Sequence, residues 1–358
     1  MRRIEGSIHE MEVSFDWIYF LRGLFFDDAP AMRANANLHP IQIAAIALQR
    51  LWCGLDIFPQ VLISGATGLV GGALRSRLEQ EAVPCATLSR KSRPGPSVYV
   101  WNPEHFEFRE DMRRLNGIRA AVHLAGESLV DGRWTTEKKR KIRESRLRGT
   151  HSMVELLSRL ERRPDVLICA SAVGYYGSRG GEILTEESSA GQDFLAEICR
   201  EWEEAAAAAR DLGIRVVSLR LGVVLARDGG ALREMLPLFR LGAGGKLGDG
   251  RQWMSWVSLP DVVRIIEFCM NEGSITGPVN TVAPEPVRNA EFTRILAHHL
   301  HRPALIPAPA FALRLAFGEM ADAALLSSTR AVPEKLRQAA FTFNQPTLPQ
   351  ALQAILPR

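Results

Sequence analysis

The sequence lacks both a disulfide framework and a cluster of metal ligands. The five cysteines are scattered and include no Cys-x-x-Cys pair: Cys53, Cys85, Cys169, Cys199 and Cys269. Because five is an odd number, any disulfide scheme leaves one cysteine unpaired, and a reducing compartment fits best. His298, His299 and His301 have no carboxylate or cysteine at ligand spacing, so we expect surface histidines and no metal site.

Long apolar runs and an excess of one charge are also absent. No apolar run approaches the ~20 residues that a spanning helix needs. Glu5, Glu10 and Glu12 interrupt the N-terminal stretch, which argues against a signal peptide. The 44 basic residues nearly balance the 40 acidic ones, so nothing favours nucleic acid as a partner. We expect a globular, cytoplasmic protein that is not an integral membrane protein.

Residues 1–58 differ in composition from the rest and form an N-terminal extension with no assigned domain. Aromatic residues are frequent there: Phe15, Trp17, Tyr19, Phe20, Phe25 and Phe26. Three alternatives stay open. The extension is a small accessory segment, a contact with a membrane surface or partner, or the product of an early start codon, with Met32 as the later start.

From Val61 onward, short apolar runs alternate with long helical stretches, which is typical of parallel βαβ units. The expected strands are Gln60–Ser64, Cys85–Ser89, Ser97–Trp101, Ala120–Leu124, Val166–Ser171, Arg215–Leu219 and Gly277–Val282. The expected helices are Leu69–Glu81, Thr135–Leu160, Gln192–Leu212 and Pro260–Asn271. The pattern predicts an α/β fold, with a Rossmann-like doubly wound parallel sheet over residues 59–288.

Beyond this region the pattern changes to helices separated by prolines. The expected helices are Asn289–Leu300, Ala310–Phe317, Pro333–Gln338 and Pro346–Leu356. They predict a smaller, mostly helical C-terminal subdomain over residues 289–358. Such subdomains commonly close over the substrate side of a nucleotide-binding fold.

Three glycines follow the first expected strand and open the first expected helix. Gly65, Gly68 and Gly71 are placed where backbone N–H groups and the positive end of a helix can hold a pyrophosphate. A plain turn between a strand and a helix needs only one glycine, so the motif alone fits a turn equally well. Its position within βαβ units favours a dinucleotide.

The end of the second expected strand distinguishes the two nicotinamide dinucleotides. An acidic residue at this point accepts from the ribose 2′-OH, whereas arginine with a small hydroxyl side chain favours a 2′-phosphate. Ser89 and Arg90 occupy the position without an acid. They predict NADP(H), and the alternative is a solvated basic loop.

Six blocks of residues carry a resemblance to a known family. They are Gly65-Ala-Thr-Gly68-Leu-Val-Gly71, His123-Leu-Ala-Gly126-Glu127, Arg133-Trp134 with Lys141-Ile-Arg-Glu-Ser145-Arg146, Ser171-Ala-Val-Gly-Tyr175-Tyr176-Gly177, Phe194-Leu-Ala-Glu with Trp202-Glu203, and Arg220-Leu-Gly222-Val-Val-Leu225. From Val61 to its end the chain resembles the extended short-chain dehydrogenase/reductase superfamily. Within this superfamily, it most resembles a subgroup of epimerase-family proteins that are described as NADP-dependent oxidoreductases and have a C-terminal domain of unknown function.

This resemblance implies the cofactor contacts. They are Gly65, Thr67, Gly68, Leu69, Val70, Gly71, Ser89, Arg90, Leu124, Ala125, Gly126, Arg146 and Val223. Ser89 and Arg90 would hold the adenosine phosphate, and Arg146 would reach the cofactor from a basic helix. We interpret Lys138, Lys139 and Arg140 of that helix as a solvated face. Glu127 fits either a substrate contact or a loop position.

The usual catalytic pair of the superfamily is missing. Its members use Tyr-x-x-x-Lys, in which the lysine lowers the pKa of the tyrosine, and the pattern does not occur in this sequence. Alignment on Glu203 puts Leu195 at the tyrosine and Cys199 at the lysine. The resemblance therefore supplies no ordinary proton donor.

The candidate catalytic residues are Ser171, Tyr175 and Tyr176. One tyrosine would donate the proton near the nicotinamide, with Ser171 assisting. Alternatively, the two rings only pack the floor of the pocket. Alignment of Tyr176 with the superfamily's Tyr-Gly puts the orienting hydroxyl at Ala172, and a shift of one residue restores Ser171.

Two functions remain open. An NADP(H)-dependent oxidoreductase or nucleotide-sugar-type epimerase, acting on an unidentified small molecule, accounts for the cofactor motifs and the C-terminal subdomain. A catalytically inactive NADP(H)-binding sensor or interaction protein accounts for the missing pair. The sequence favours the enzyme, and it specifies neither the substrate nor the oligomeric state.

Overall fold

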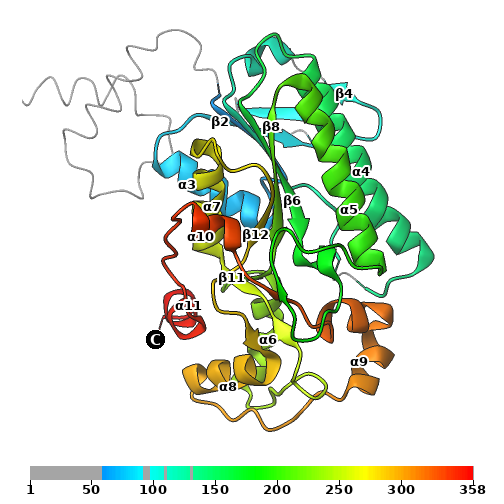
Figure 1. Cartoon of the computed structure of the whole chain (residues 1–358), viewed down its shortest axis with the longest axis vertical. Helices are drawn as coiled ribbons and strands as arrows, with labels where there is room; N and C mark the ends of the chain where they lie inside the picture. The colour runs from blue at the N-terminus through cyan, green and yellow to red at the C-terminus, as the bar shows by residue number, and fades with distance from the viewer. Residues whose placement is uncertain (1–58, 92–96, 109–110, 130–131, 358) are drawn as a thin grey trace, which may run out of the picture. The chain divides into compact units, whose positions relative to one another are not determined.

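The computed structural model describes residues 59–91, 97–108, 111–129 and 132–357. The N-terminal extension, with its three alternatives, lies outside the described residues. Figure 1 shows the sheet running through the middle of the described region, with α6, α8 and α9 gathered beyond one end of its strands.

The central sheet has eight strands in the order β12-β8-β6-β5-β1-β2-β3-β4. Their bounds are β1 Val61–Ser64, β2 Cys85–Ser89, β3 Val98–Asn102, β4 Glu107–Phe108, β5 Ala120–His123, β6 Val166–Ala172, β8 Arg215–Leu221 and β12 Gly277–Thr281. All neighbouring strands pair in parallel except β3 and β4, which pair antiparallel. The predicted Rossmann-like sheet is confirmed. The short strand β4 is an addition that the sequence pattern did not indicate.

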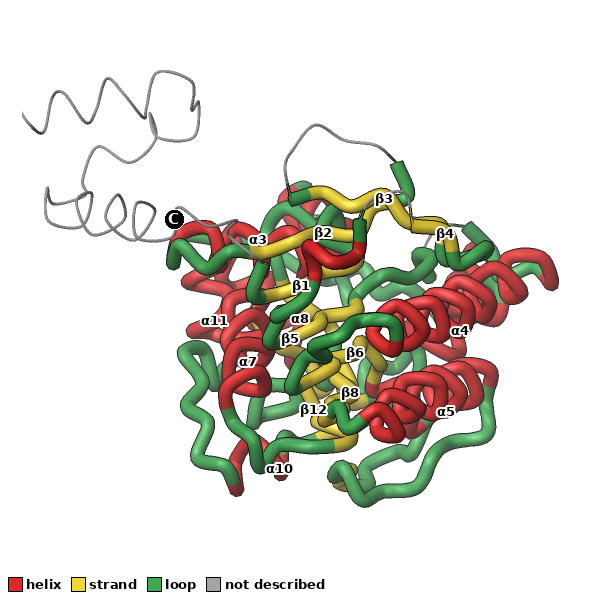
Figure 2. Tube along the Cα trace, turned by 90° about the horizontal axis from the view of Figure 1, so that it is seen from above, coloured by secondary structure: helices red, strands yellow, loops and turns green. Residues whose placement is uncertain are grey.

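Helices cover both faces of this sheet, as Figure 2 shows. One face carries α3 (Leu69–Gln80) and α7 (Leu259–Asn271), and the other carries α4 (Thr136–Ser158) and α5 (Phe194–Ala207). Alternate residues of β1 point to opposite faces: Ile63 packs with the α3 and α7 core, whereas Leu62 packs with the α4 and α5 core. A strand buried on both faces has no polar face, which explains the continuous apolar runs in the sequence.

The remaining strands and α-helices follow β6 along the chain. They are β7 Ile183–Leu184, β9 Val223–Leu225, α6 Gly230–Arg240, β10 Trp253–Met254, β11 Trp256–Ser258, β13 Val287–Arg288, α8 Asn289–Leu300, α9 Ala310–Phe317, β14 Arg330–Ala331, α10 Glu334–Gln338 and α11 Leu348–Ile355. Short 3-10 turns lie at Met112–Leu115, Val173–Tyr176 and Ala208–Leu212, and a π turn lies at Ala321–Leu325. The four C-terminal helices agree with the prediction to within one or two residues. Helix α6 was not predicted.

A separate core joins α6 to the C-terminal helices. Phe239 of α6, Phe292 of α8 and Leu352 of α11 pack in one cluster with Trp256 of β11. This cluster takes residues from both sides of position 289. The predicted boundary at that position therefore crosses a shared core.

A buried carboxylate fastens the C-terminal segment to the sheet region. Asp261, at the start of α7, accepts hydrogen bonds from the backbone N–H groups of Asn344 and Gln345, both at 2.9 Å. Its second oxygen also accepts from Ser258 Oγ at 3.1 Å. The chain is thereby held against α7 after α10 and before α11.

The carboxyl ends of β1 and β5 are joined by a buried polar pair. His123 Nδ1 and Ser64 Oγ share a hydrogen bond of 2.6 Å. The ring is fully buried, and this burial lowers the pKa of His123 to about 4. The folded chain therefore keeps the ring neutral at pH values where the unfolded chain protonates it.

His123 gives a prediction for the pH dependence of stability. As the pH falls from about 6.5 to about 4, the unfolded chain gains a proton at His123 that the folded chain does not. The free energy of unfolding should therefore decrease over this range by up to about 3 kcal/mol. His123→Gln should remove this component in urea unfolding measured between about pH 7 and pH 4.5, whereas His151→Gln, at an exposed position, should keep it. Equal pH dependence in the wild type and His123→Gln would contradict the assignment.

Candidate functional site

The turn between β1 and α3 needs two of its glycines for close backbone packing. Gly65 has a φ of +74°, in the left-handed region that favours glycine. A Cβ there would lie 2.7 Å from the carbonyl carbon of Leu124. A Cβ on Gly71 would collide with the Gly65 carbonyl oxygen. Because these two glycines have no side chain, α3 can pack directly against the ends of β1 and β5.

Gly68 has a different role in this turn. It is the N-cap of α3, and it supplies no capping side chain. A Cβ at this position would meet only the Gly65 carbonyl oxygen, at 3.3 Å. No acidic residue lies in the first turn of α3, which leaves the N–H groups of Leu69, Val70 and Gly71 available to an anion.

The residues of this turn therefore fit the pyrophosphate of a dinucleotide. Uncapped helix N–H groups, the positive end of the helix and an unobstructed approach over Gly68 are the features that such a group needs. Thr67 is exposed at the same turn. The six residues predicted here run from the end of β1 into the first turn of α3, and of them Gly71 is buried.

The end of β2 presents a cation beside a hollow. Ser89 is half-buried, and its hydroxyl donates to the Lys91 carbonyl at 2.8 Å. Arg90 is exposed and forms no ion pair among the described residues. A cavity of about 240 Å³ is lined by Arg90, Val100, Trp101, Asn102, Glu104 and Glu107. The strand end itself has no acidic residue, as a 2′-phosphate would require.

The loop after β5 contacts the one predicted cofactor residue that lies on α4. Arg146 is only 8% exposed, and its guanidinium lies beside Gly126. Its Nη1 donates to the carbonyls of Glu127 and Ile142, at 3.1 and 3.0 Å. No carboxylate among the described residues pairs with it, and burial lowers its pKa. Arg146 therefore brings an uncompensated positive charge to the Leu124–Gly126 loop.

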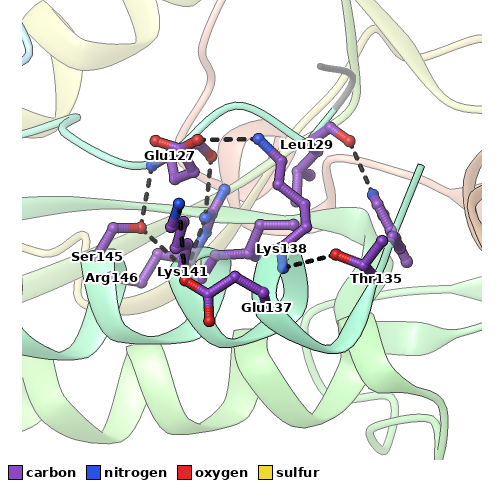
Figure 3. A network of polar contacts seen from close by, with 10 residues as sticks. Glu127, Leu129, Thr135, Glu137, Lys138, Lys141, Ser145 and Arg146 are labelled. Atoms are coloured by element: carbon purple, nitrogen blue, oxygen red, sulfur yellow. Dashed lines mark hydrogen bonds and ion pairs between the residues drawn. The ribbon is translucent and has the colours of Figure 1, made fainter. Parts of the chain in front are cut away.

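Lys138 is not the solvated residue that the sequence suggested. Its side chain is only 14% exposed, and its Nζ lies 2.9 Å from Glu127 Oε1. Figure 3 shows this pair beside Arg146 and Ser145, with the Ser145 hydroxyl accepting from the Glu127 N–H. Lys138 and the other nearby cations lower the pKa of Glu127. The helical period places Lys138 two turns before Arg146, which is the signal that could have grouped them.

Ser171 lies near the end of β6, and its hydroxyl is hydrogen-bonded within the protein. Its hydroxyl donates to Glu203 Oε1 at 2.7 Å, and the residue is buried. Glu203 in turn accepts two hydrogen bonds from Arg220, Nε to Oε1 and Nη2 to Oε2, both at 2.9 Å. Sequence reasoning missed Arg220 as a site residue. A charged residue inside the apolar run of β8 was the available signal.

The two tyrosines after β6 have different surroundings. Tyr176 is fully buried: its hydroxyl donates to Asn280 Oδ1 at 2.6 Å and accepts from Arg220 Nη1 at 2.9 Å. Burial raises the pKa of Tyr176 to about 12. Tyr175 is partly exposed, and the Arg220 guanidinium lies 3.4 Å from its ring centroid. Only Tyr175 of the pair reaches the surface.

Leu195 and Cys199 face the same region from α5. Leu195 packs in an apolar cluster with Trp134, Ile198 and Met320. Cys199 is buried, and burial raises its pKa to about 11. Neither side chain provides an acid or a base near neutral pH.

The other predicted features can be placed briefly. Val223 lies in β9, and its N–H donates to the Ser255 carbonyl at 2.8 Å. Cys85, Cys169, Cys199 and Cys269 are free thiols, and Cys53 lies outside the described residues. Within the described ranges, no group of three or more histidine, cysteine or acidic side chains is arranged to hold a metal ion. In the same part of the chain, no helix combines the length and the apolar character needed to cross a membrane.

Comparison with known families gives two matches. The model of the NAD-dependent epimerase/dehydratase family matches residues 61–280. A domain of unknown function, DUF1731, matches residues 308–355. Together they cover the sheet region and most of the C-terminal helices described above.

Two relatives match over most of their length. Epimerase family protein Mb2239 of Mycobacterium bovis is 42% identical over 294 residues, which cover 82% of this chain and 96% of that protein. The chloroplastic epimerase family protein SDR39U1 homolog of Arabidopsis thaliana is 37% identical over 305 residues, covering 83% and 86%.

Two solved structures are similar in fold and sequence. Human epimerase family protein SDR39U1, solved with NADPH, has a TM-score of 0.75 and 30% identity, over 82% of this chain and 98% of that one. A nucleoside-diphosphate sugar epimerase from Corynebacterium glutamicum has a TM-score of 0.67 and 38% identity, over 88% and 62%. With its sheet order, its glycine turn and these matches, the chain belongs to the NAD-dependent epimerase/dehydratase family, within the extended short-chain dehydrogenase/reductase superfamily.

Proposed function

We propose that this protein is an NADP(H)-dependent oxidoreductase or nucleotide-sugar-type epimerase with an atypical proton donor. The observation that carries the proposal is the uncapped N-terminus of α3 behind Gly68, together with Arg90 at the end of β2, which is exposed and forms no ion pair with the residues that the structure describes. The first feature fits a pyrophosphate, and the second fits a 2′-phosphate. NADPH in the structure of the human relative supports the same cofactor.

Different residues of the chain bind different parts of the cofactor. Backbone N–H groups of Leu69 to Gly71 bind the pyrophosphate, and Arg90 with Ser89 binds the adenosine phosphate. The ends of β5 and β6 would hold the nicotinamide half, with the Arg146 guanidinium beside Gly126. Val223 borders this half from β9. NADP(H), when bound, supplies the hydride.

We assign the proton transfer to Tyr175 rather than Tyr176. The Tyr176 hydroxyl has both a donor and an acceptor partner in a buried position, so it is committed to the fold. The Ser171 hydroxyl likewise donates to Glu203. We therefore assign Ser171 a role in positioning Glu203 and not in contacting the substrate. Tyr175 is partly exposed and is held by Arg220. Arg220 fixes the ring, and the hydroxyl exchanges the proton with the substrate.

One observation favours a second function. Leu195 and Cys199 fill the positions of the superfamily's tyrosine and lysine with groups that cannot transfer a proton. A protein that binds NADP(H) only to sense its redox state or to contact a partner would need no other residues in place of the catalytic tyrosine and lysine. The two functions differ in whether bound NADPH is consumed.

The cofactor assignment predicts a selective effect of Arg90→Ala. Loss of a charge-assisted phosphate contact costs about 1–3 kcal/mol, so the affinity for NADPH should fall roughly ten- to a hundredfold. The affinity for NADH should change little, since it lacks the 2′-phosphate. Titrations followed by cofactor fluorescence would measure both. Arg75→Ala, which removes an exposed charge from the side of α3, is the matched control. An equal loss of affinity for NADPH and NADH would show that Arg90 does not bind the 2′-phosphate.

The proton-donor assignment predicts different outcomes for the two tyrosines. With a panel of carbonyl compounds and nucleotide sugars, Tyr175→Phe should lower the rate of NADPH consumption by about a hundredfold or more, at unchanged NADPH affinity. Tyr176→Phe should instead lower the free energy of unfolding by about 1–3 kcal/mol, because Asn280 and Arg220 lose a buried partner. Full turnover by Tyr175→Phe would exclude it as the donor. Tight NADPH binding with no consumption by the wild type would favour the sensor.

A further inference from the structure

Three cationic side chains of α4 point toward the first residues after β5. Figure 3 shows Lys138, Lys141 and Arg146 rising from successive turns of the helix toward Glu127. Arg90, from the end of β2, also lowers the pKa of Glu127. Among the described residues, Glu127 and Glu137 form ion pairs with two of these three α4 cations, whereas Glu104 and Glu107 line the cavity beside Arg90. The α4 side of this edge therefore carries unbalanced positive charge at Arg146, which forms no ion pair within the described ranges.

Lys138 is the most enclosed of the lysines in this cluster. Its Nζ contacts Glu127 Oε1 at 2.9 Å, with a side chain that is only 14% exposed. By contrast, Lys141 is mostly exposed and contacts Glu137 at 3.6 Å. An enclosed ammonium has lost much of its hydration, and one partly exposed carboxylate compensates it only in part. An anion that takes the place of the Glu127 carboxylate would make the same charge-assisted contact with Lys138.

Arg146 extends the same positive region inward. Its buried guanidinium donates to two backbone carbonyls and packs over the Trp202 ring, 4.9 Å from its centroid. Carbonyl oxygens satisfy N–H groups, but they do not neutralise a charge. Lys138 and Arg146 thus flank Glu127 with more positive charge than it can balance.

The cluster lies on the side of the C-terminal helices. Arg133, just before α4, donates to the Leu315 carbonyl at 2.9 Å. Lys139 forms an ion pair with Glu319, and Trp134 packs against Met320. Arg90 lies at the end of β2, on the far side of β1 from β5. At about 4.8 Å per strand, the ends of β2 and β5 are about 10 Å apart.

We propose that Lys138, with Lys141 and Arg146, forms a binding site for a phosphate or carboxylate group of the substrate, and that Glu127 is the counter-ion this group replaces. The inference rests on the proposed function, in which NADP(H) occupies the site at the ends of β1 and β2. It narrows the substrate to small molecules that carry an anionic group. In the absence of the anion, Glu127 keeps Lys138 folded toward the loop. When the anion binds, Lys138 exchanges one oxyanion partner for another.

Inorganic phosphate is the probe for this site, measured by calorimetric titration of protein first saturated with NADP⁺. Saturation fills the phosphate sites of the cofactor itself. Lys138→Met should weaken phosphate binding by about tenfold or more, because it removes a charge-assisted contact. Glu127→Gln should strengthen binding several-fold by removing the competing carboxylate. Arg159→Met removes one exposed positive charge from the far end of α4 and should leave binding unchanged. Thermal unfolding of each variant verifies the fold.

Three results would overturn the inference. Phosphate binding that is undetectable in the wild type excludes the site, and equal binding by the wild type and Lys138→Met shows an adventitious ion only. Phosphate that binds cofactor-free protein, is displaced by NADP⁺ and is lost in Arg90→Ala belongs to the cofactor's 2′-phosphate. Failure of the proposed function appears separately, as failure of NADP⁺ to saturate the protein in the first titration. In that case, phosphate titration of the cofactor-free variants still tests Lys138.

Discussion

The buried ion pair between Arg220 and Glu203 is the interaction on which the candidate active site depends. The two side chains are 3% and 14% exposed, and two hydrogen bonds of 2.9 Å join them. Glu203 uses one of these oxygens to hold Ser171, while Arg220 holds Tyr176 through its hydroxyl and Tyr175 through its ring. Removing one partner would leave an uncompensated buried charge, at a cost of about 3–5 kcal/mol. The ends of β6 and β8, α5 and the turn that carries the tyrosines are thus held as one unit.

The cofactor region is organised by groups that are left without partners. Among the described residues, the first turn of α3 has no capping side chain, Arg90 forms no ion pair, and the guanidinium of the buried Arg146 donates only to carbonyls. Arg90 is exposed and can be hydrated, whereas the charge of the buried Arg146 is unfavourable without an anionic partner. In the proposed function, the pyrophosphate and the 2′-phosphate would provide negative charge, and the nicotinamide half would provide polar acceptors. The position of the superfamily's tyrosine has instead become apolar: Leu195 helps to fasten Met320, beyond α9, to the sheet region.

The sequence predicted the features that follow from local pattern. Seven strands, four helices of the sheet region and four C-terminal helices were found because apolar runs, glycines and prolines mark their limits. Helix α6 was missed because its apolar residues pack against distant helices, α8 and α11, and its start at Gly229-Gly230 resembles a loop. The Arg220 network was missed because it joins β6, α5 and β8, which the topology brings together. The Lys138–Glu127 pair was missed because local pattern does not show that the loop after β5 lies against the first turn of α4.

A single substitution tests whether α3 binds the pyrophosphate of NADP(H) through its open N-terminus. In Gly68→Asp the new carboxylate can cap the helix N–H groups, because Asp is a favoured N-cap residue and Gly68 already has an extended conformation. Calorimetric titration with NADPH, alongside thermal unfolding, would measure both consequences. We expect a folded protein with at least wild-type melting temperature that no longer binds NADPH. A folded Gly68→Asp protein that binds NADPH with wild-type affinity would contradict it.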